Sequence, residues 1–232
     1  MFTLSPDEVE VLQLSLRVAL WSVWISLPFG IAVAYLLART NFPGKSLFDA
    51  LVHLPLILPP VVVGYMLLML LGRRGPLGSL LEQHFGIVVA FRWTGAAVAS
   101  AIMGFPLLVR AIRLSLESVD RNLEAAAGTL GAGWGWVFLT ITLPLMLPGV
   151  ITGVLLSFAR SLGEFGATIT FVSNIPGETR TLPLAIYSYT QSPTGDLQAL
   201  RLSILSIVLS LIALTVSEVL VRRAGRRVTG HD

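Results

Sequence analysis

The chain has no cysteine, few charged residues and few histidines. Without cysteine among its 232 residues, it has no disulfide framework and no thiolate ligand for a metal ion. Charged residues make up 12% of the sequence and hydrophobic residues 54%, whereas soluble domains carry about a quarter charged residues. His53, His84 and His231 are far apart in the sequence, which argues against a metal site. This composition indicates an integral membrane protein.

The net charge of +3 does not indicate nucleic-acid binding. The excess arginine lies at the ends of apolar segments, as the topology of membrane proteins predicts. The first ten residues hold Asp7, Glu8 and Glu10 but no basic residue, so we do not expect a cleavable signal peptide. We found no internal repeat or low-complexity tract, and therefore expect one transmembrane domain over residues 1–232.

Five apolar stretches are long enough to cross a hydrocarbon core of roughly 30 Å as helices. We predict an all-α fold with membrane spans at about 11–37, 47–71, 95–114, 139–162 and 200–221. Pro28 predicts a kink in the first span, and Pro55, Pro59 and Pro60 lie in the first half of the second. The segment 169–189 is apolar only in pieces. We do not count it as a span. It suits a re-entrant or interfacial element, which is tolerated only where it is buried in protein or lines a cavity.

The distribution of Lys and Arg predicts an orientation in the membrane. The side that holds the loop near 38–46, the segment 110–138 and the tail carries nine of these residues. The other side carries five, although the adjacent Arg73 and Arg74 work against the bias. Basic residues accumulate on the cytoplasmic side. The C-terminus is therefore predicted to be cytoplasmic and the N-terminus to be outside, which agrees with an odd number of spans.

The polar segment at about 115–138 joins the third and fourth predicted spans. Asp120 is a plausible N-cap for a short helix, with Glu124 near its first turn. Small alanines in that helix offer a shallow face to another protein, and four nearby glycines permit a sharp turn. Trp134 and Trp136 are each best interpreted as anchors at the membrane surface. Glu124 alone would suggest only a solvated cap, but the ordered motif around it favours a docking site for a partner.

This segment resembles the EAA motif of bacterial ABC importer permeases, E-A-A-x-x-x-G-x(9)-I-x-L-P. We assign its positions to Glu124, Ala125, Ala126, Gly131, Ile141, Leu143 and Pro144. The resemblance implies the type I importer arrangement, in which this loop is a coupling helix seated in a separate ATPase subunit. It also implies a homodimer, two ATPase subunits that bind ATP and magnesium, and an extracytoplasmic binding protein. This chain itself would then hold no cofactor and catalyse no reaction.

Arg160 and Glu164 stand four residues apart at the end of the fourth predicted span. They would lie on one helical face if the helix continued. A mutual ion pair is the simpler interpretation, and a positive contribution of Arg160 to an anion path is the alternative. We predict that Gly166, Thr168 and Thr170 line the path or its gate together with this pair. However, the glycine can serve loop geometry alone, and threonines in membrane helices often bond their own backbone.

The residues around this pair resemble one branch of the importer family. Residues 159–168 are similar to the permeases for molybdate, tungstate, sulfate and thiosulfate, and residues 173–181 are similar to the molybdate permeases. The resemblance implies an oxyanion importer of the bacterial inner membrane, surrounded by lipid. Molybdate is the favoured cargo, and sulfate, thiosulfate or tungstate are alternatives.

Two other classes of protein fit the sequence less well. A transporter driven by an ion gradient would need intramembrane carboxylates and usually inverted repeats, and Glu164 and Glu218 are poor candidates. A membrane-embedded enzyme would need a convergent set of polar catalytic residues. Gly44-Lys45-Ser46 imitates the end of a phosphate-binding loop, but Arg39 stands where that motif requires a further glycine. ATP hydrolysis must then come from a separate subunit.

Overall fold

The computed structural model describes residues 4–229, in which every regular element is a helix. The predicted all-α class is therefore confirmed for this part of the chain. The elements are, in order, α1 (Pro6–Arg39), α2 (Lys45–Ile57), α3 (Pro60–Leu71), α4 (Pro76–Phe85), α5 (Trp93–Glu117), α6 (Arg121–Thr129), α7 (Trp134–Val137), the π-helical η1 (Phe138–Thr142), α8 (Leu143–Leu162), α9 (Gly166–Val172), α10 (Leu182–Thr190) and α11 (Asp196–Thr229).

The first predicted span is the central part of α1, which begins earlier and ends later than expected. Its start is fixed by a capping box, in which the Ser5 hydroxyl accepts from the Glu8 backbone and the Glu8 carboxylate accepts from the Ser5 backbone. This arrangement satisfies backbone N–H groups that have no partner inside the helix. The helix continues unbroken through Pro28, and the kink expected there stays a prediction.

The second predicted span is wrong as a single helix. It is divided into α2 and α3, which meet at an angle of 112°. Leu58 has an extended backbone with ψ of 142°, because the ring of the following proline disfavours helical geometry in the residue before it. Pro59 and Pro60 then start the new helix. The pair is long and apolar enough for a broken span or a re-entrant loop.

The third and fourth predicted spans coincide with helices that are long and apolar enough to cross a membrane. The third is α5, and the fourth is the continuous helical stretch Trp134–Leu162 that comprises α7, η1 and α8. The fifth corresponds to the first part of α11, where residues 196–216 are long and apolar enough to cross a membrane. The structure describes no side chains at 217–218 and 221–232, so Glu218, His231 and the tail arginines lie outside the described side chains.

The segment 169–189, which was not predicted to span the membrane, contains the end of α9 and most of α10. Phe171 and Val172 of α9 are fully buried. Three residues of α10 are buried to the same degree: Leu182, Leu184 and Ala185. The Leu182 backbone N–H donates to the Ser15 hydroxyl of α1 at 2.7 Å. Burial against protein is what allows such broken segments to lie at membrane depth.

Small residues let α1, α5 and α8 pack closely in the centre of the molecule. A Cβ added at Gly30 of α1 would lie 2.7 Å from a methyl carbon of Leu108 on α5, and one at Gly153 of α8 would lie 3.0 Å from the same side chain. Close approach through small residues is how helices associate in lipid, where hydrophobic burial contributes little. These three helices carry the core to which the peripheral helices attach.

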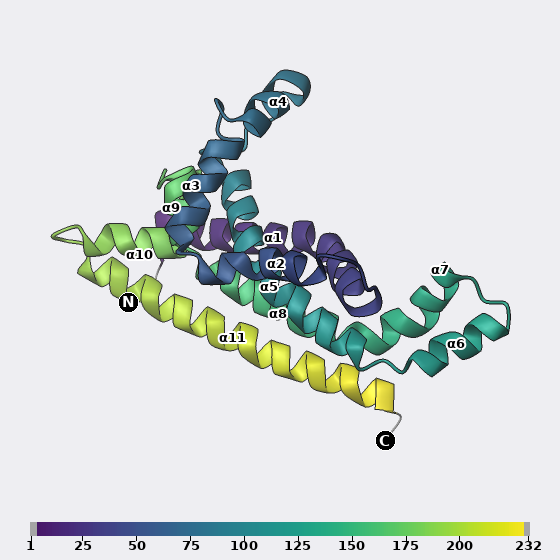
Figure 1. The fold of residues 1–232 in the computed structure, drawn as a ribbon. Helices are drawn as coiled ribbons and strands as arrows, with labels where there is room; N and C mark the ends of the chain where they lie inside the picture. Colours follow the sequence, from purple (N-terminus) through teal and green to yellow (C-terminus); the bar gives the residue numbers. More distant parts are fainter. Residues whose placement is uncertain (1–3, 230–232) are drawn as a thin grey trace.

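The molecule has two distinct ends (Figure 1). The N-terminus and α10 lie at one end, where Arg201 of α11 forms an ion pair with the buried Glu8 at 3.3 Å. The α6–α7 hairpin projects at the other end, near the C-terminal end of α11 (Figure 1). Since α1 runs for about 50 Å at 1.5 Å per residue, its two ends are far enough apart to lie on opposite sides of a membrane.

Candidate functional site

The predicted short helix in the polar segment is α6, and its N-cap is the expected residue. The Asp120 carboxylate accepts a hydrogen bond from the Asn122 backbone N–H at 2.9 Å. After the helix, Gly131 has a φ of +86°, in the left-handed region that favours glycine. Leu123 and Leu130 are exposed, the latter to 89%. The hairpin therefore presents apolar side chains outside the helical core.

Glu124 is not a solvated cap, because its carboxylate contacts two other side chains of the chain. Its Oε1 forms an ion pair with the Nη2 of Arg39 at 3.0 Å and accepts a hydrogen bond from the Thr142 hydroxyl at 2.7 Å. Neither Arg39 nor Thr142 was predicted to contact Glu124. The only signal at Arg39 was a basic residue in the last turn of a helix, where the helix dipole favours a cation.

Aromatic side chains join the second half of the hairpin to α1. The Trp134 indole N–H donates to the Tyr35 hydroxyl at 2.9 Å. Trp134 stacks on Phe138 with ring centroids 5.9 Å apart, and the Tyr35 ring meets both rings edge-on. A cavity of about 210 Å³ lies between these rings and Glu124. Trp134 therefore has a structural contact in addition to the role of membrane anchor that its sequence position predicts.

The assignment of Glu124 to the first position of the motif needs a correction. The pattern places its glycine three residues after the alanine pair, whereas four residues separate Ala126 from Gly131. In register with Gly131, the first position falls on Ala125, and Glu124 stands one residue before it. Ala125 is exposed while Glu124 is partly buried. The last part of the pattern, at Ile141, Leu143 and Pro144, keeps its spacing and lies across η1 and the start of α8.

The predicted ion pair between Arg160 and Glu164 is present, although α8 ends between them at Leu162. The Arg160 Nη1 lies 2.6 Å from Glu164 Oε2. The other carboxylate oxygen accepts a hydrogen bond from the Ala167 backbone N–H at 2.8 Å, at the first turn of α9. The Glu164 side chain is 1% exposed and that of Arg160 27%. Glu164 thus neutralises a cation and satisfies the start of a helix at once.

The other predicted path residues all lie on α9 and have local partners. A Cβ at Gly166 would lie 2.7 Å from Pro60 of α3, so this glycine permits the contact between the two helices. Thr168 donates to the Phe165 carbonyl at 2.9 Å and Thr170 to the Gly166 carbonyl at 2.7 Å. Both hydroxyls therefore bond their own backbone, the alternative weighed for such residues. A role in translocation stays a prediction for these residues.

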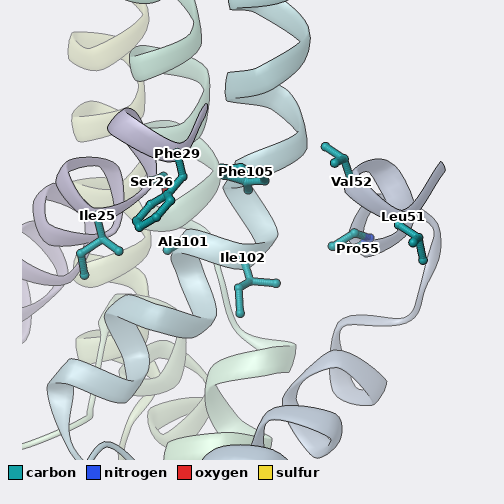
Figure 2. A pocket seen from close by; sticks show the side chains of 9 residues that line it. All are labelled: Ile25, Ser26, Phe29, Leu51, Val52, Pro55, Ala101, Ile102 and Phe105. Carbon is teal, nitrogen blue, oxygen red and sulfur yellow. The ribbon is translucent and has the colours of Figure 1, made fainter. Parts of the chain in front are cut away.

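A cavity of about 400 Å³ lies between α1, α2 and α5. Figure 2 shows the side chains of α1 and α5 on one side and those of α2 on the other: Ile25, Ser26, Phe29, Ala101, Ile102, Phe105, Leu51, Val52 and Pro55. Ser26 is the one polar residue among these nine, and its hydroxyl donates to the Ser22 carbonyl. An oxyanion would lose its hydration there without compensation, so this cavity does not suit such a ligand.

No group of three or more His, Asp or Glu side chains is placed to hold a metal ion in the described part of the chain. Gly44 has a φ of +85° and is the N-cap of α2, and Lys45 and Ser46 are the first residues of that helix. The Lys45 ammonium donates to the Thr40 carbonyl at 3.0 Å. This is loop geometry between two helices and not the strand-to-helix context of a phosphate-binding loop.

Comparison with protein families decides the class of this helical membrane protein. Residues 26–226 match the family described as the inner membrane component of binding-protein-dependent transport systems. The chain belongs to this family. It is consequently a multi-pass component of the inner membrane that serves transport and is not itself an enzyme.

Several curated members of the family are similar over nearly the whole chain. The molybdenum transport system permease protein ModB of Escherichia coli (strain K12) is 60% identical over 227 residues, which cover 96% of this chain and 99% of the relative. The ModB protein of Haemophilus influenzae is 58% identical, with 95% and 96% covered. The sulfate transport system permease protein CysW of Synechococcus elongatus is 38% identical, with 96% and 77% covered.

Solved structures show the same fold at low sequence identity. A bacterial ABC transporter that imports the acidic polysaccharide alginate superposes with a TM-score of 0.74 at 16% identity, covering 95% of this chain and 80% of that chain. An amino acid ABC transporter gives 0.62 at 20% identity, with 94% of each chain covered. The arrangement of helices is therefore that of ABC importer permeases.

Proposed function

We propose that this chain is the permease subunit of an ATP-driven importer that translocates molybdate. The observation that carries this proposal is its 60% identity to a molybdenum transport permease across 99% of that protein. The sulfate permease CysW shares 38% identity and is covered over 77% of its length. The chain is thus much closer in sequence and in length to the ModB proteins of Escherichia coli and Haemophilus influenzae than to CysW.

The exposed α6–α7 hairpin supports docking of a separate ATPase subunit at this end of the molecule. Leu123, Leu130 and Trp136 are exposed apolar side chains, and a patch of such side chains is typical of an interaction site. In this proposal the hairpin is cytoplasmic and the N-terminus is outside. ATP closes a dimer of ATPase subunits, and the hairpins carry that motion to the membrane helices. The two states differ in their contacts with the nucleotide-bound partner, which is what allows ATP to shift their populations.

A homodimer would place the translocation path between two copies of this chain. Helix α4 projects from the body of the molecule (Figure 1), and α3, which precedes it, exposes Tyr65, Met66 and Met69. A second copy is a suitable cover for such a surface. A dianion needs polar surroundings at membrane depth, and Arg160, Glu164, Gly166, Thr168 and Thr170 remain our candidates for the path or gate. The extracytoplasmic binding protein would supply the affinity for molybdate.

ATP-dependent uptake into proteoliposomes tests this function. The vesicles contain the chain, its ATPase and its binding protein, with ATP inside and labelled molybdate outside with the binding protein. We expect uptake by the unmodified complex and loss of uptake by Gly131→Trp and Glu124→Lys, with the dimer still inserted. Gly131→Trp puts a bulky residue at a positive φ, and Glu124→Lys places a cation against Arg39. Normal uptake by both variants would contradict the assignment of this loop to coupling.

A second cargo is favoured by one specific observation, the 38% identity to a sulfate permease over 96% of this chain. Sulfate, thiosulfate and tungstate are tetrahedral dianions, like molybdate. The same machine could therefore serve them if the binding protein accepted them. Competition between labelled molybdate and each unlabelled anion distinguishes these cargoes.

A further inference from the structure

One carboxylate connects three separate elements at the hairpin end of the molecule. Oε1 of Glu124, on α6, is 3.0 Å from Arg39 Nη2 at the end of α1 and 2.7 Å from the Thr142 hydroxyl in η1. The same Arg39 nitrogen also reaches the Val119 carbonyl in the connection between α5 and α6, at 3.5 Å. The sequence separates Arg39 from Glu124 by 85 residues, so this contact is a tertiary link and not a local one.

The contacts of Glu124 with Arg39 and Thr142 are largely shielded from water, which strengthens them. The Arg39 side chain is 8% exposed and that of Glu124 22%, and Thr142 is buried. Ion pairs fully exposed on a surface contribute little, whereas partly buried and hydrogen-bonded pairs are screened less. Arg39 also stands in the last turn of α1, where the helix dipole favours its charge.

The connectivity of the chain gives this link a mechanical consequence. Short connections join α6 to α5 and to α7, but no short connection joins it to α1. A displacement of α6 would otherwise reach α1 through the packing of α1 against α5 and α8, through a hydrogen bond from the exposed Arg121 to the Ala38 carbonyl, and through the contacts of Trp134 and Phe138 with Tyr35. Of these routes, only the Arg121 hydrogen bond starts on α6 itself. An ion pair that holds the last turn of α1 directly to α6 makes the two move together.

We propose that Arg39 is a positioning residue for energy coupling, which makes α1 follow the ATP-driven motion of α6. Thr142 makes the corresponding link to α8 through η1, at the position that the I-x-L-P pattern leaves open. Glu124 then acts inside the chain, which agrees with its place one residue before the motif in register with Gly131. This inference rests on the proposed function, because it assumes that α6 is the element that the ATPase displaces.

The test measures how many molybdate ions enter proteoliposomes per ATP hydrolysed by the complete complex. Coupling free energies between sites commonly correspond to factors of about 5 to 150. We therefore expect Arg39→Gln to lower this ratio at least about fivefold while the complex stays assembled and hydrolyses ATP. Thr142→Val keeps the side-chain shape, removes the hydroxyl and should lower the ratio as well. Arg110→Gln, which removes an exposed cation from α5, is the matched control and should leave the ratio unchanged.

Two further readouts separate coupling from a general structural defect. The double variant Arg39→Gln with Glu124→Gln should import as many molybdate ions per ATP as Arg39→Gln alone, because both substitutions remove the same contact. Labels on cysteines introduced at the exposed Asn41 and Thr129 report the distance between the end of α1 and α6. That distance should stay constant upon ATP binding in the parent chain and change in Arg39→Gln.

The inference would be overturned if Arg39→Gln changed neither the ratio of molybdate imported to ATP hydrolysed nor the distance between the labels. It would also be overturned if the double variant lowered that ratio by the product of the two single effects. Failure of the unmodified complex to import any oxyanion would instead overturn the proposed function. Even then, the label distances would decide whether α1 moves with α6 when ATP binds.

Discussion

Glu164 shows how one buried residue can serve two neighbours. Its carboxylate forms an ion pair with Arg160 and accepts from the backbone at the start of α9. An intramembrane charge without a partner is costly, and the pair removes that cost for Arg160. The four-residue spacing predicted the pair from the sequence. The backbone contact could not be predicted, because it depends on α8 ending at Leu162 and a new helix starting after Phe165.

Replacing Glu164 with alanine should destabilise the protein by about 2 kcal/mol. The substitution leaves the Arg160 guanidinium and the Ala167 N–H without their partner, but Arg160 is partly exposed and can recruit water. Thermal or denaturant unfolding of the purified protein in detergent measures this. Glu82→Ala is the matched control, because the Glu82 carboxylate lies 3.9 Å from Arg73 on an exposed surface and such pairs contribute about 0–1 kcal/mol. Equal stability of both variants would contradict the paired role of Glu164.

Glu124 marks the limit of residue-level prediction in the polar segment 115–138. The helix, its Asp120 cap and the turn at Gly131 follow from side-chain chemistry and were predicted. The partners of Glu124 come from α1 and η1. No local pattern connects residue 124 with residue 39, since their contact depends on how the helices pack.

At the scale of elements, the break between α2 and α3 is the main difference from the predicted fold. Hydropathy detects the length of an apolar segment and not its direction, so the segment 47–71 reads as one span. The three prolines were visible in the sequence, and the residue before a proline is a probable helix boundary. The magnitude of the bend could not be predicted, because it is set by the packing of α3 against α9 and not by the prolines alone.

The α3–α9 contact gives a prediction about a single methyl group. A Cβ at Gly64 would lie 2.5 Å from the Ala167 carbonyl oxygen and 2.9 Å from its Cα. Backbone atoms cannot move aside as a flexible side chain can, so Gly64→Ala should destabilise the protein by about 1–3 kcal/mol. Gly128→Ala is the control for stability, because its Cβ would meet nothing within 4 Å and alanine favours a helix. Unfolding of both variants in detergent gives the comparison, and a neutral Gly64→Ala would mean that the two helices are packed more loosely.

At the scale of the whole molecule, the sequence predicted the class, the number of apolar segments and the family resemblance. These depend on composition and on a spaced motif, both of which a single sequence displays. The relation between the two ends of the molecule depends on tertiary contacts. Ion pairs at Glu8–Arg201 and Arg39–Glu124 place the N-terminus and α6 at opposite ends of α1.

The predicted orientation can be tested directly because the chain contains no cysteine. Single cysteines introduced at the exposed Gln83 of α4 and at Leu130 after α6 are treated with a membrane-impermeant thiol reagent in intact spheroplasts. We expect Gln83→Cys to react in intact cells and Leu130→Cys to react only after permeabilisation. The parent chain is the control for background labelling. Reaction of Leu130→Cys from outside would reverse the topology and exclude ATPase docking at this hairpin.

The measurement that tests the central claim most directly is competition during uptake. Proteoliposomes with the chain, its ATPase and its binding protein receive ATP inside and labelled molybdate outside, with sulfate in large excess. The account predicts ATP-dependent molybdate uptake that resists sulfate. Uptake abolished by sulfate would keep the importer and change its cargo. No ATP-dependent uptake of any oxyanion by an intact complex would contradict the account.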